Sequence, residues 1–391
     1  MRRLGELRIC ALCALSAGCI EPAPRPVLPD STTRAPLVLT SVAAGANHTC
    51  GLTPEGAAWC WGWNRYGQLG AALPDAFSST PRPVTGDLKF AQLGAGGNHT
   101  CGLTPARLAY CWGWNLSDQL GTPEPLQRDR PGPAVAIQPL VEIRAGGRHT
   151  CARTDANLAY CWGLNTDGQA GGSEDDDPRE RAPVTTEVHF TALALGGRHS
   201  CALTAAGAAY CWGANEVGQL GRGDTLGSAT PAPVAGALTL RQLTAGRFHT
   251  CGLTTDDTAY CWGWNAAGQL GTGGDPERAT VPVPVAGGLR FTALAAGGVH
   301  SCGIASDGTA WCWGVNAWGQ LGDGTRLSRP APAPVTGGLR FSALVAGSEH
   351  TCGLATDRAV YCWGYGGGGE IGDGTQQSRL VPTPVAGQRP Q

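Results

Sequence analysis

Hydrophobic and polar residues alternate in short runs along the chain, and glycine-rich segments separate the runs. Alternation of this kind is typical of half-buried β-strands, and the glycines are typical of the turns between them. In residues 289–335 the predicted strands are Leu289–Leu294, His300–Ile304, Thr309–Trp313 and Pro332–Val335. Turns are predicted at 296–298 and 306–308. The segment therefore predicts four short strands and no helix.

The same unit recurs seven times. His-Thr/Ser-Cys ends at Cys50, Cys101, Cys151, Cys201, Cys251, Cys302 and Cys352, and Cys-Trp-Gly begins at Cys60, Cys111, Cys161, Cys211, Cys261, Cys312 and Cys362. Successive units lie 50 or 51 residues apart. Seven units of four strands predict an all-β fold, a single seven-bladed β-propeller over residues 37–387. The repeat thus replaces the two or three domains that 391 residues would otherwise suggest.

The cysteine pairs predict a strand register. If Cys50 lies opposite Cys60, then Thr49 faces Trp61. Because side chains alternate along a strand, His48 and Cys50 lie on one face of the blade, and Thr49 and Trp61 lie on the other. Packing the aromatic face of one blade against the His/Cys face of the next would bury both faces around a ring.

The segments between units also suggest how the ring closes. Gly337-Gly338 stands between two strand-like segments, and such a pair favours a hairpin. We therefore expect the fourth strand of one unit to pair with the first strand of the next. The ring would then close by pairing Leu380–Val385 with Leu37–Ala43.

Residues 1–19 have the layout of a bacterial secretory signal. Three arginines precede the short apolar run Ile9–Leu15, and small residues precede Cys19, as in a lipoprotein cleavage box. We expect an extracytoplasmic protein anchored to a bacterial membrane by lipidated Cys19, with plain secretion or an uncleaved start as alternatives. The proline-rich residues 20–36 predict an extended tether, and 388–391 a short tail.

The composition and the motifs of the chain disfavour several classes of function. Charged residues are 15% of the chain and the net charge is -2, which disfavours a nucleic-acid partner. No run after the leader approaches the roughly 20 apolar residues that span a bilayer, so the lipid anchor would be the membrane contact. Phosphate-binding loops and hydrolase motifs are absent, and we expect no cofactor. The acidic run 174–177 lacks the spacing of a calcium loop and is expected to be solvated.

The repeated cysteines and histidines allow two interpretations. His48, Cys50 and Cys60 share a face and could bind zinc, but the spacing is not that of a metal knuckle. The secretory leader favours seven disulfides, and we expect no metal. Seven histidines recur once per unit, whereas a catalytic centre is a unique constellation, so we expect a structural role for them. The eighth, His189, is expected on an exposed strand position.

Residues that vary between units indicate a binding surface. In an antiparallel blade, the turn after the first strand and the loop after the third emerge on the same side of the ring. The variable aromatic and arginine residues there are Trp63, Tyr66, Trp114, Arg148, Arg198, Arg247, Phe248, Trp264, Trp318 and Tyr365. These residue types dominate protein interfaces. The alternative is that Trp63, Trp114 and Trp264 cap the blade edges.

The string Ala-Gly-x-x-His-Thr/Ser-Cys-x-Leu, followed by Tyr/Trp-Cys-Trp-Gly-x-Asn-x-x-Gly-Gln-Leu-Gly, resembles the regulator of chromosome condensation repeat family. The resemblance covers roughly residues 37–387, with near-complete copies at 45–70, 146–171, 196–221, 246–271 and 297–322. It implies a single seven-bladed propeller. The last unit departs from the pattern at Gly366 and Glu370, and the second at Asp118.

The family includes a nuclear exchange factor for a small GTPase, a plant ultraviolet-B photoreceptor and a secreted bacterial β-lactamase inhibitor. Function does not follow from the fold alone. We expect a monomeric, non-enzymatic protein that binds a protein or cell-envelope ligand through one propeller face, with enzyme inhibition as the most concrete form. The photoreceptor tryptophan of the Gly-x-Arg-His loop is replaced by Gly97, Gly147, Gly197 and Arg247.

Two other functions remain as alternatives. A guanine-nucleotide exchange factor would use an inserted hairpin, and no interval between units exceeds 51 residues. An envelope polysaccharide enzyme would need a carboxylate pair in the central channel. The acidic residues that occur in one unit alone, Glu216, Glu349 and Glu370, show no obvious convergence in the sequence.

Overall fold

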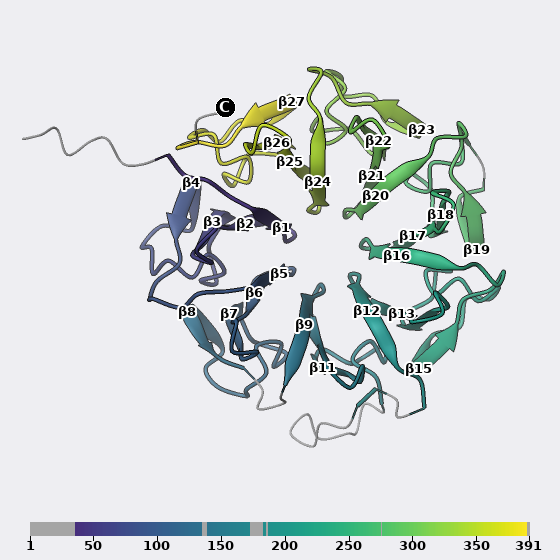
Figure 1. The fold of residues 1–391 in the computed structure, drawn as a ribbon, viewed down its shortest axis with the longest axis horizontal. Coiled ribbons are helices and arrows are strands. Elements are labelled where there is room, and N and C mark those ends of the chain that lie inside the picture. Colours follow the sequence, from purple (N-terminus) through teal and green to yellow (C-terminus); the bar gives the residue numbers. More distant parts are fainter. Residues whose placement is uncertain (1–35, 135–138, 173–182, 185–186, 275, 389–391) are drawn as a thin grey trace, which may run out of the picture. The chain divides into compact units, whose positions relative to one another are not determined.

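The computed structural model describes residues 36–134, 139–172, 183–184, 187–274 and 276–388. Within these ranges the chain forms 27 strands and no helix. The strands make seven sheets around a central axis (Figure 1). The predicted all-β, seven-bladed propeller is therefore confirmed. The leader, Cys19, the tether up to residue 35 and the acidic run 174–177 lie outside the described residues.

Six of the seven blades contribute one described strand to each of four concentric positions, and the remaining blade contributes one to each of the inner three. The innermost strands are β1 (Ser41–Ala44), β5 (Gln92–Ala95), β9 (Leu140–Ala145), β12 (Phe190–Leu195), β16 (Leu240–Ala245), β20 (Phe291–Ala296) and β24 (Phe341–Ala346). The second strands are β2 (His48–Leu52), β6 (His99–Leu103), β10 (His149–Thr154), β13 (His199–Thr204), β17 (His249–Thr254), β21 (His300–Ala305) and β25 (His350–Ala355).

The third strands are β3 (Ala58–Trp63), β7 (Ala109–Trp114), β11 (Ala159–Gly163), β14 (Ala209–Gly213), β18 (Ala259–Trp264), β22 (Ala310–Gly314) and β26 (Val360–Gly364). The outermost strands are β4 (Phe77–Pro83), β8 (Gln127–Pro133), β15 (Ser228–Pro233), β19 (Arg278–Pro284), β23 (Arg329–Pro334) and β27 (Arg379–Pro384). We number the blades 1 to 7 in chain order. For blade 3 the described residues contain three strands.

Every described blade is an antiparallel meander built from the strands of a single unit. In blade 6 the outermost strand β23 pairs with β22, and in blade 7 the innermost strand β24 pairs with β25. The expectation that a fourth strand pairs with the first strand of the next unit was wrong. Gly337 and Gly338, with φ of 99° and 68°, carry the chain from the rim of blade 6 to the centre of blade 7 (Figure 1). The two strands lie at opposite radii, so they cannot form a ladder.

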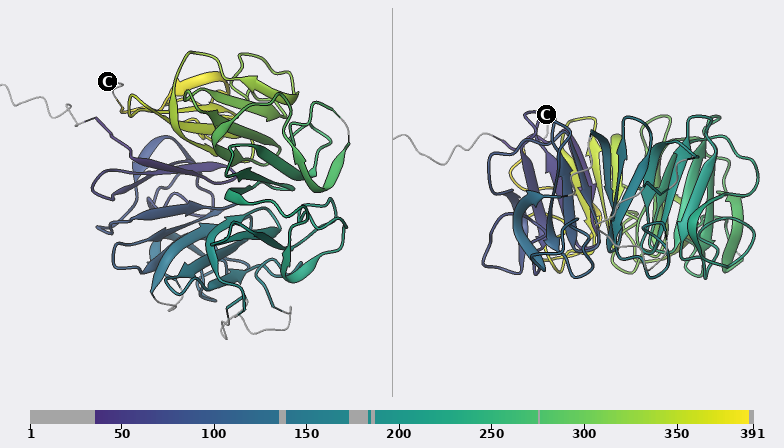
Figure 2. Two further views of the ribbon diagram at one scale, coloured as in Figure 1. Left: turned by 45° about the vertical axis from the view of Figure 1, so that its right-hand side comes forward. Right: turned by 90° about the horizontal axis from the view of Figure 1, so that it is seen from below.

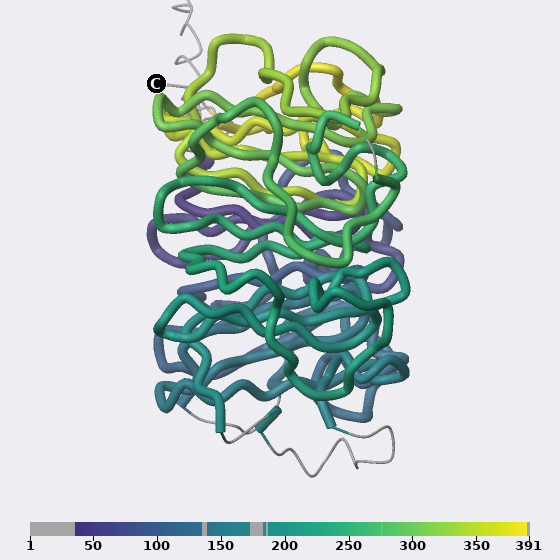
Figure 3. Tube along the Cα trace, turned by 90° about the vertical axis from the view of Figure 1, so that its right-hand side faces the viewer, coloured from purple at the N-terminus to yellow at the C-terminus, as the bar shows by residue number. Residues whose placement is uncertain are grey.

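The ring closes by blade packing. Sheet 7 ends at β27 and sheet 1 begins at β1, so the expected pairing of Leu380–Val385 with Leu37–Ala43 was also wrong. The terminal segments share one backbone hydrogen bond, from Leu37 N to Gly387 O at 2.8 Å. Leu39 packs in one hydrophobic cluster with side chains of blade 7. Viewed from the rim, the blades lie side by side as successive layers (Figure 3).

A repeated hydrogen-bond chain joins neighbouring blades. His48 Nε2 of blade 1 lies 2.8 Å from Thr100 Oγ1 of blade 2. Thr100 donates its own proton to Gln68 O at 2.9 Å, so its oxygen accepts from His48 Nε2–H. The fully buried Trp112 donates its indole N–H to the same carbonyl at 2.9 Å. The predicted packing of the Thr/Trp face against the His/Cys face is confirmed.

The same hydroxyl-to-carbonyl bonds follow His99, His149, His199, His249 and His300, through Thr150, Ser200, Thr250, Ser301 and Thr351. At the seam between blades 7 and 1, Thr49 Oγ1 lies 2.9 Å from His350 Nε2. Trp61 there donates to Glu370 O at 2.9 Å. The seam therefore carries the same kinds of contact as the other junctions.

The cysteine register is as predicted. Cys50 pairs with Cys60, Thr49 with Trp61, and the same offset holds in all seven blades. All seven pairs lie at disulfide distance, with Cα atoms 4.0–4.1 Å apart. The pairs connect the two central strands of each blade.

Glycines permit the close approach of blades. A Cβ on Gly45 would lie 2.4 Å from Gly96 O of the next blade, which no side chain tolerates. Backbone hydrogen bonds link these first turns around the whole ring, and we call their location the channel mouth. The bonds run from Ala46 N to Gly96 O, Gly97 N to Gly146 O, Gly147 N to Gly196 O, Gly197 N to Gly246 O, Arg247 N to Gly297 O, Gly298 N to Gly347 O and Ser348 N to Ala46 O.

Candidate functional site

The first turn and the loop after the third strand lie together in every blade. In blade 1, Trp63 N donates to Asn47 O at 2.8 Å. Equivalent bonds join Trp114 to Asn98, Leu164 to Arg148, Ala214 to Arg198, Trp264 to Phe248, Val315 to Val299 and Tyr365 to Glu349. These seven pairs of turn and loop make one side of the ring, which we call the turn-loop face. Figure 2 shows loops at both ends of the upright strands, and this face is one of those two ends.

A stack of three side chains spans blades 1 to 3 on this face. The rings of Tyr66 and Trp114 are 5.4 Å apart and inclined by 28°. The Arg148 guanidinium lies over Trp114, with Cζ 4.4 Å from the ring centroid. Stacking of this kind is worth about 0.5–1 kcal/mol at exposed sites. Residues from three units thus meet in one cluster.

Two further clusters carry most of the other predicted residues. In blade 5, Phe248 packs edge-on against Trp264 at 5.9 Å, and Arg247 Cζ lies 4.9 Å from the Phe248 ring. Trp318 of blade 6 packs edge-on against Tyr365 of blade 7 at 5.1 Å. The Trp318 side chain is 37% exposed, whereas the other rings are half-buried.

The remaining two predicted residues behave differently. Trp63 lies beside the blade 7 loop, since a Cβ on Gly368 would be 3.1 Å from its Cε3. Arg198 forms ion pairs with Asp167 and, at 3.4 Å, with Glu216. The hydrogen bond to Asp167 raises the pKa of Arg198 above its usual value. Arg198 is therefore neutralised within the face, unlike Arg148 of blade 3 and Arg247 of blade 5.

The sequence marks Glu370 as a departure from the repeat without indicating its environment. Glu370 takes the position that Gln320 holds in blade 6, and its Oε2 accepts from Gly368 N at 2.8 Å as Gln320 accepts from Trp318 N. Glu370 is 1% exposed, and this burial raises its pKa to about 7. The charge of Glu349 adds to the increase. The departure of Glu370 from the repeat was the signal in the sequence.

Tyr365 lies between these acids and the aromatic cluster. Burial raises the pKa of its hydroxyl, and the charges of Glu370 and Glu349 add to the effect. The first turn of blade 7 is therefore acidic, whereas the first turns of blades 3 to 5 carry arginines.

The seven repeated histidines are buried and neutral. Burial lowers the pKa of His48, His99, His199, His249 and His300 to about 3, and of His149 and His350 to about 4. Each holds a hydroxyl of the next blade, which is a structural role. His189 is exposed as expected, but it lies just before β12 and not on a strand, and its Nδ1 lies 2.9 Å from Ala156 O.

Other site types have little support in the described part of the chain. It contains no group of three or more His, Cys, Asp or Glu side chains placed to hold a metal ion. That part of the chain also contains no helix long and apolar enough to cross a membrane.

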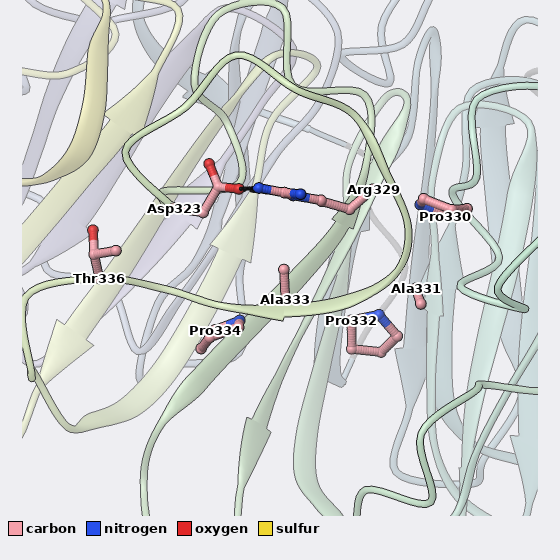
Figure 4. A pocket seen from close by; sticks show the side chains of 8 residues that line it. All are labelled: Asp323, Arg329, Pro330, Ala331, Pro332, Ala333, Pro334 and Thr336. Carbon is pink, nitrogen blue, oxygen red and sulfur yellow. Dashed lines mark hydrogen bonds and ion pairs between the residues drawn. The ribbon is translucent and has the colours of Figure 1, made fainter.

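An open cavity of about 510 Å³ lies on the rim along β23 (Figure 4). Its wall is Pro330, Pro332 and Pro334 with intervening alanines, closed at one end by the Asp323–Arg329 ion pair at 2.9 Å. Proline lacks the N–H that would pair with another strand, so this edge is protected from β-augmentation.

Comparison with protein families matches the regulator of chromosome condensation (RCC1) repeat at residues 39–68, 90–119, 140–169, 190–219, 240–269, 291–320 and 341–370. Among curated proteins, the chain is 32% identical over 94 residues to the ultraviolet-B receptor UVR8 of Arabidopsis thaliana, covering 24% of this chain and 21% of the receptor. It is 34% identical over 85 residues to the probable E3 ubiquitin-protein ligase HERC4 of Rattus norvegicus, covering 21% of this chain and 8% of the ligase. The matches thus span about a fifth or less of these relatives.

Solved structures agree on the fold. Human WBSCR16 aligns with a TM-score of 0.77 at 20% identity, covering 84% of this chain and 94% of that one. Prp20p of Saccharomyces cerevisiae, described with its binding properties to Gsp1p and histones, aligns with a TM-score of 0.77 at 24% identity, covering 85% and 87%. At these identities the similarity shows the architecture alone.

Proposed function

The chain belongs to the regulator of chromosome condensation repeat family, and we propose that it is a non-enzymatic, extracytoplasmic binding protein. Its turn-loop face would recognise a protein or a cell-envelope ligand, and inhibition of a secreted or periplasmic enzyme is the most concrete form. A propeller of this family is a scaffold for protein interaction, so the specific activity comes from the residues that differ between blades.

The grouping of variable aromatics and arginines carries the proposal. Trp318 and Tyr365, for example, come from different blades and meet at 5.1 Å on the turn-loop face. The fully buried Trp61 and its counterparts pack between blades, so we expect the ring to fold without the half-exposed tryptophans of the face. Aromatic and arginine side chains on a rigid support lose little entropy on binding.

The cysteines support an extracytoplasmic location. Seven pairs at disulfide distance suit an oxidising compartment. The signal-like residues 1–19 and Cys19 add a route to that compartment and an anchor in a bacterial membrane, with secretion as the alternative. A monomer on a proline-rich tether would leave the face free to meet its ligand.

A guanine-nucleotide exchange factor is the second candidate. The overall similarity to Prp20p favours it, since that protein was described with binding to Gsp1p. Against it, the 50- or 51-residue spacing leaves no room for an inserted hairpin. An envelope polysaccharide enzyme has less support, because Glu370 is 1% exposed and cannot reach a substrate.

The test is a pull-down from native cell envelope with the mature chain as bait. The triple variant Trp63→Ala, Trp264→Ala, Trp318→Ala should lose the partner while its thermal transition stays close to the original. The control variant Val281→Ala, Val381→Ala removes exposed apolar side chains from the outer strands β19 and β27 and should keep the partner. Capture of a small GTPase would favour the second candidate, and loss of the fold in the triple variant would show that these tryptophans cap the blades.

A further inference from the structure

We propose that the turn-loop face binds an acidic segment of its protein partner, with carboxylates held by Arg148 and Arg247. This inference rests on the proposed function and states the chemistry of the partner. The one or two residues before the buried histidine differ between blades, and these differences distribute charge unevenly around the channel mouth.

The first turns of blades 3, 4 and 5 carry Arg148, Arg198 and Arg247. Glu349 of blade 7 takes the position of Arg148 and Arg198, directly before the histidine, whereas Arg247 stands one position earlier, before Phe248. All four turns belong to the ring of backbone hydrogen bonds at the channel mouth, where Gly147 N donates to Gly196 O at 3.0 Å and Arg247 N donates to Gly297 O at 3.2 Å. One side of the mouth is therefore cationic and the blade 7 side is anionic.

Arg148 is oriented for a ligand. Its guanidinium Cζ lies 4.4 Å from the centroid of the Trp114 ring, and Trp114 itself stacks on Tyr66. Among the described residues no carboxylate pairs with Arg148, and its buried Nε has no hydrogen-bond partner. Stacking leaves the N–H edge of a guanidinium available, and that edge matches the two oxygens of a carboxylate.

Arg247, two blades away, also lies beside an aromatic ring, here that of the next residue in its own turn. Its Cζ lies 4.9 Å from the Phe248 ring, the side chain is exposed, and no ion pair forms with it in the described part of the chain. Between the two stands Arg198, whose charge is already matched by Asp167 and Glu216. Within the described first turns, Arg148 and Arg247 are thus unpaired guanidinium groups on either side of an internally satisfied one.

This pattern suits an extended segment that bears at least two carboxylates and crosses blade 4. Glu349 and the buried Glu370 would repel the same segment from blade 7, which sets its direction on the face. The apolar rings of Trp114, Phe248 and Trp264 beside the arginines favour a peptide over the phosphates of a lipid surface. The net charge of -2 also gives the chain no general attraction to an anionic membrane.

The probe is a fluorescent deca-glutamate peptide, titrated with the mature chain at low salt and followed by anisotropy. We expect binding that weakens as salt is added. Arg148→Gln with Arg247→Gln should weaken it at least tenfold. The control variant Arg198→Gln with Asp167→Asn removes an internal ion pair without a net change of charge, and should change the affinity less than twofold. A deca-lysine peptide should not bind to the arginine side.

Three results would overturn the inference: equal loss in both double variants, no loss in either, or arginine-dependent binding to phosphatidylglycerol vesicles without binding to the peptide. A different measurement, the envelope pull-down, tests the proposed function. If the envelope pull-down recovers a partner that depends on Trp63, Trp264 and Trp318 but deca-glutamate does not compete with it, the acidic segment is wrong and the binding face stands. If no partner depends on the face, the proposed function itself is wrong.

Discussion

Replacing Glu370 by glutamine should stabilise the ring in a pH-dependent way. Glutamine is the residue of the other six units at this position, and its Oε1 can accept the Gly368 N–H that Glu370 Oε2 accepts now. The substitution therefore keeps the local hydrogen bond and removes an ionisable group from the seam, where Glu370 O also accepts the Trp61 indole N–H.

The magnitude follows from the raised pKa. Burial, with the charge of Glu349, moves the pKa of Glu370 from 4.5 to about 7. Below pH 4.5 the carboxyl is protonated in both the folded and the unfolded chain, so it costs nothing. As the pH rises to 7 the unfolded chain releases the proton first, and the free energy of unfolding falls. Above pH 7 the full difference is present, about 3 kcal/mol as an upper estimate.

The assay is guanidinium denaturation of the disulfide-intact chain at pH 4.5 and pH 8, with Glu370→Gln compared at each pH. The buried Nε2 of five of the other glutamines lacks a partner, so the new amide brings a penalty of its own. That penalty is the same at both pH values, and the diagnostic quantity is the change of the difference between them. We expect the variant to gain about 2–3 kcal/mol more at pH 8 than at pH 4.5.

The matched control is Gln320→Glu in blade 6, which places the same acid in the same loop geometry. It should destabilise the chain at pH 8 and have little effect at pH 4.5. An equal effect of Glu370→Gln at both pH values would refute the reasoning, because it would show that the proton on Glu370 is not responsible.

Three further predictions concern the repeat and the anchor. Reduction should add the mass of 14 hydrogens to the mature ring, and removing one pair, as in Cys201→Ser with Cys211→Ser, should lower the free energy of unfolding by about 3 kcal/mol, measured by denaturation. The seven histidines have pKa values of about 3 to 4 when folded against 6.5 unfolded, so the free energy of unfolding should fall as the pH drops below 6.5, and a melting temperature that stays constant from pH 7 to 5 would contradict this. Cys19→Ser should move the protein from the membrane to the soluble extracytoplasmic fraction on immunoblots, whereas an unchanged distribution would argue against a lipid anchor.

Much of each blade could be predicted because its paired strands lie close together along the chain. A period of two along a strand and a spacing of ten between cysteines are enough to place Thr49 opposite Trp61. They also place the histidines and tryptophans on opposite faces. The repeated pattern then implies that every face meets its complement in the next unit. Blade number, register and cysteine pairing therefore followed from the chain itself.

The wrong prediction that a fourth strand pairs with the first strand of the next unit shows what turn residues alone do not specify. Gly337-Gly338 indicates that the chain reverses direction. A hairpin needs such a reversal, and so does a crossing from the rim of one blade to the centre of the next. Whether β23 and β24 share a ladder depends on the position of β22, which already occupies the inner edge of β23. The same competition explains the closure, because β1 and β27 are each paired within their own blades.

The sequence by itself determined which residues would lie on the turn-loop face, since the turns and loops of an antiparallel blade alternate between its two ends. Only the tertiary structure decided how they group there. Arg148 lies over Trp114 of a neighbouring blade, and Arg198 is neutralised by Asp167. Glu370 O accepts the indole N–H of Trp61, although the two residues belong to the last and the first blade. Stacking, ion pairing and burial act through distances of a few ångströms, and those distances exist only once the ring has closed.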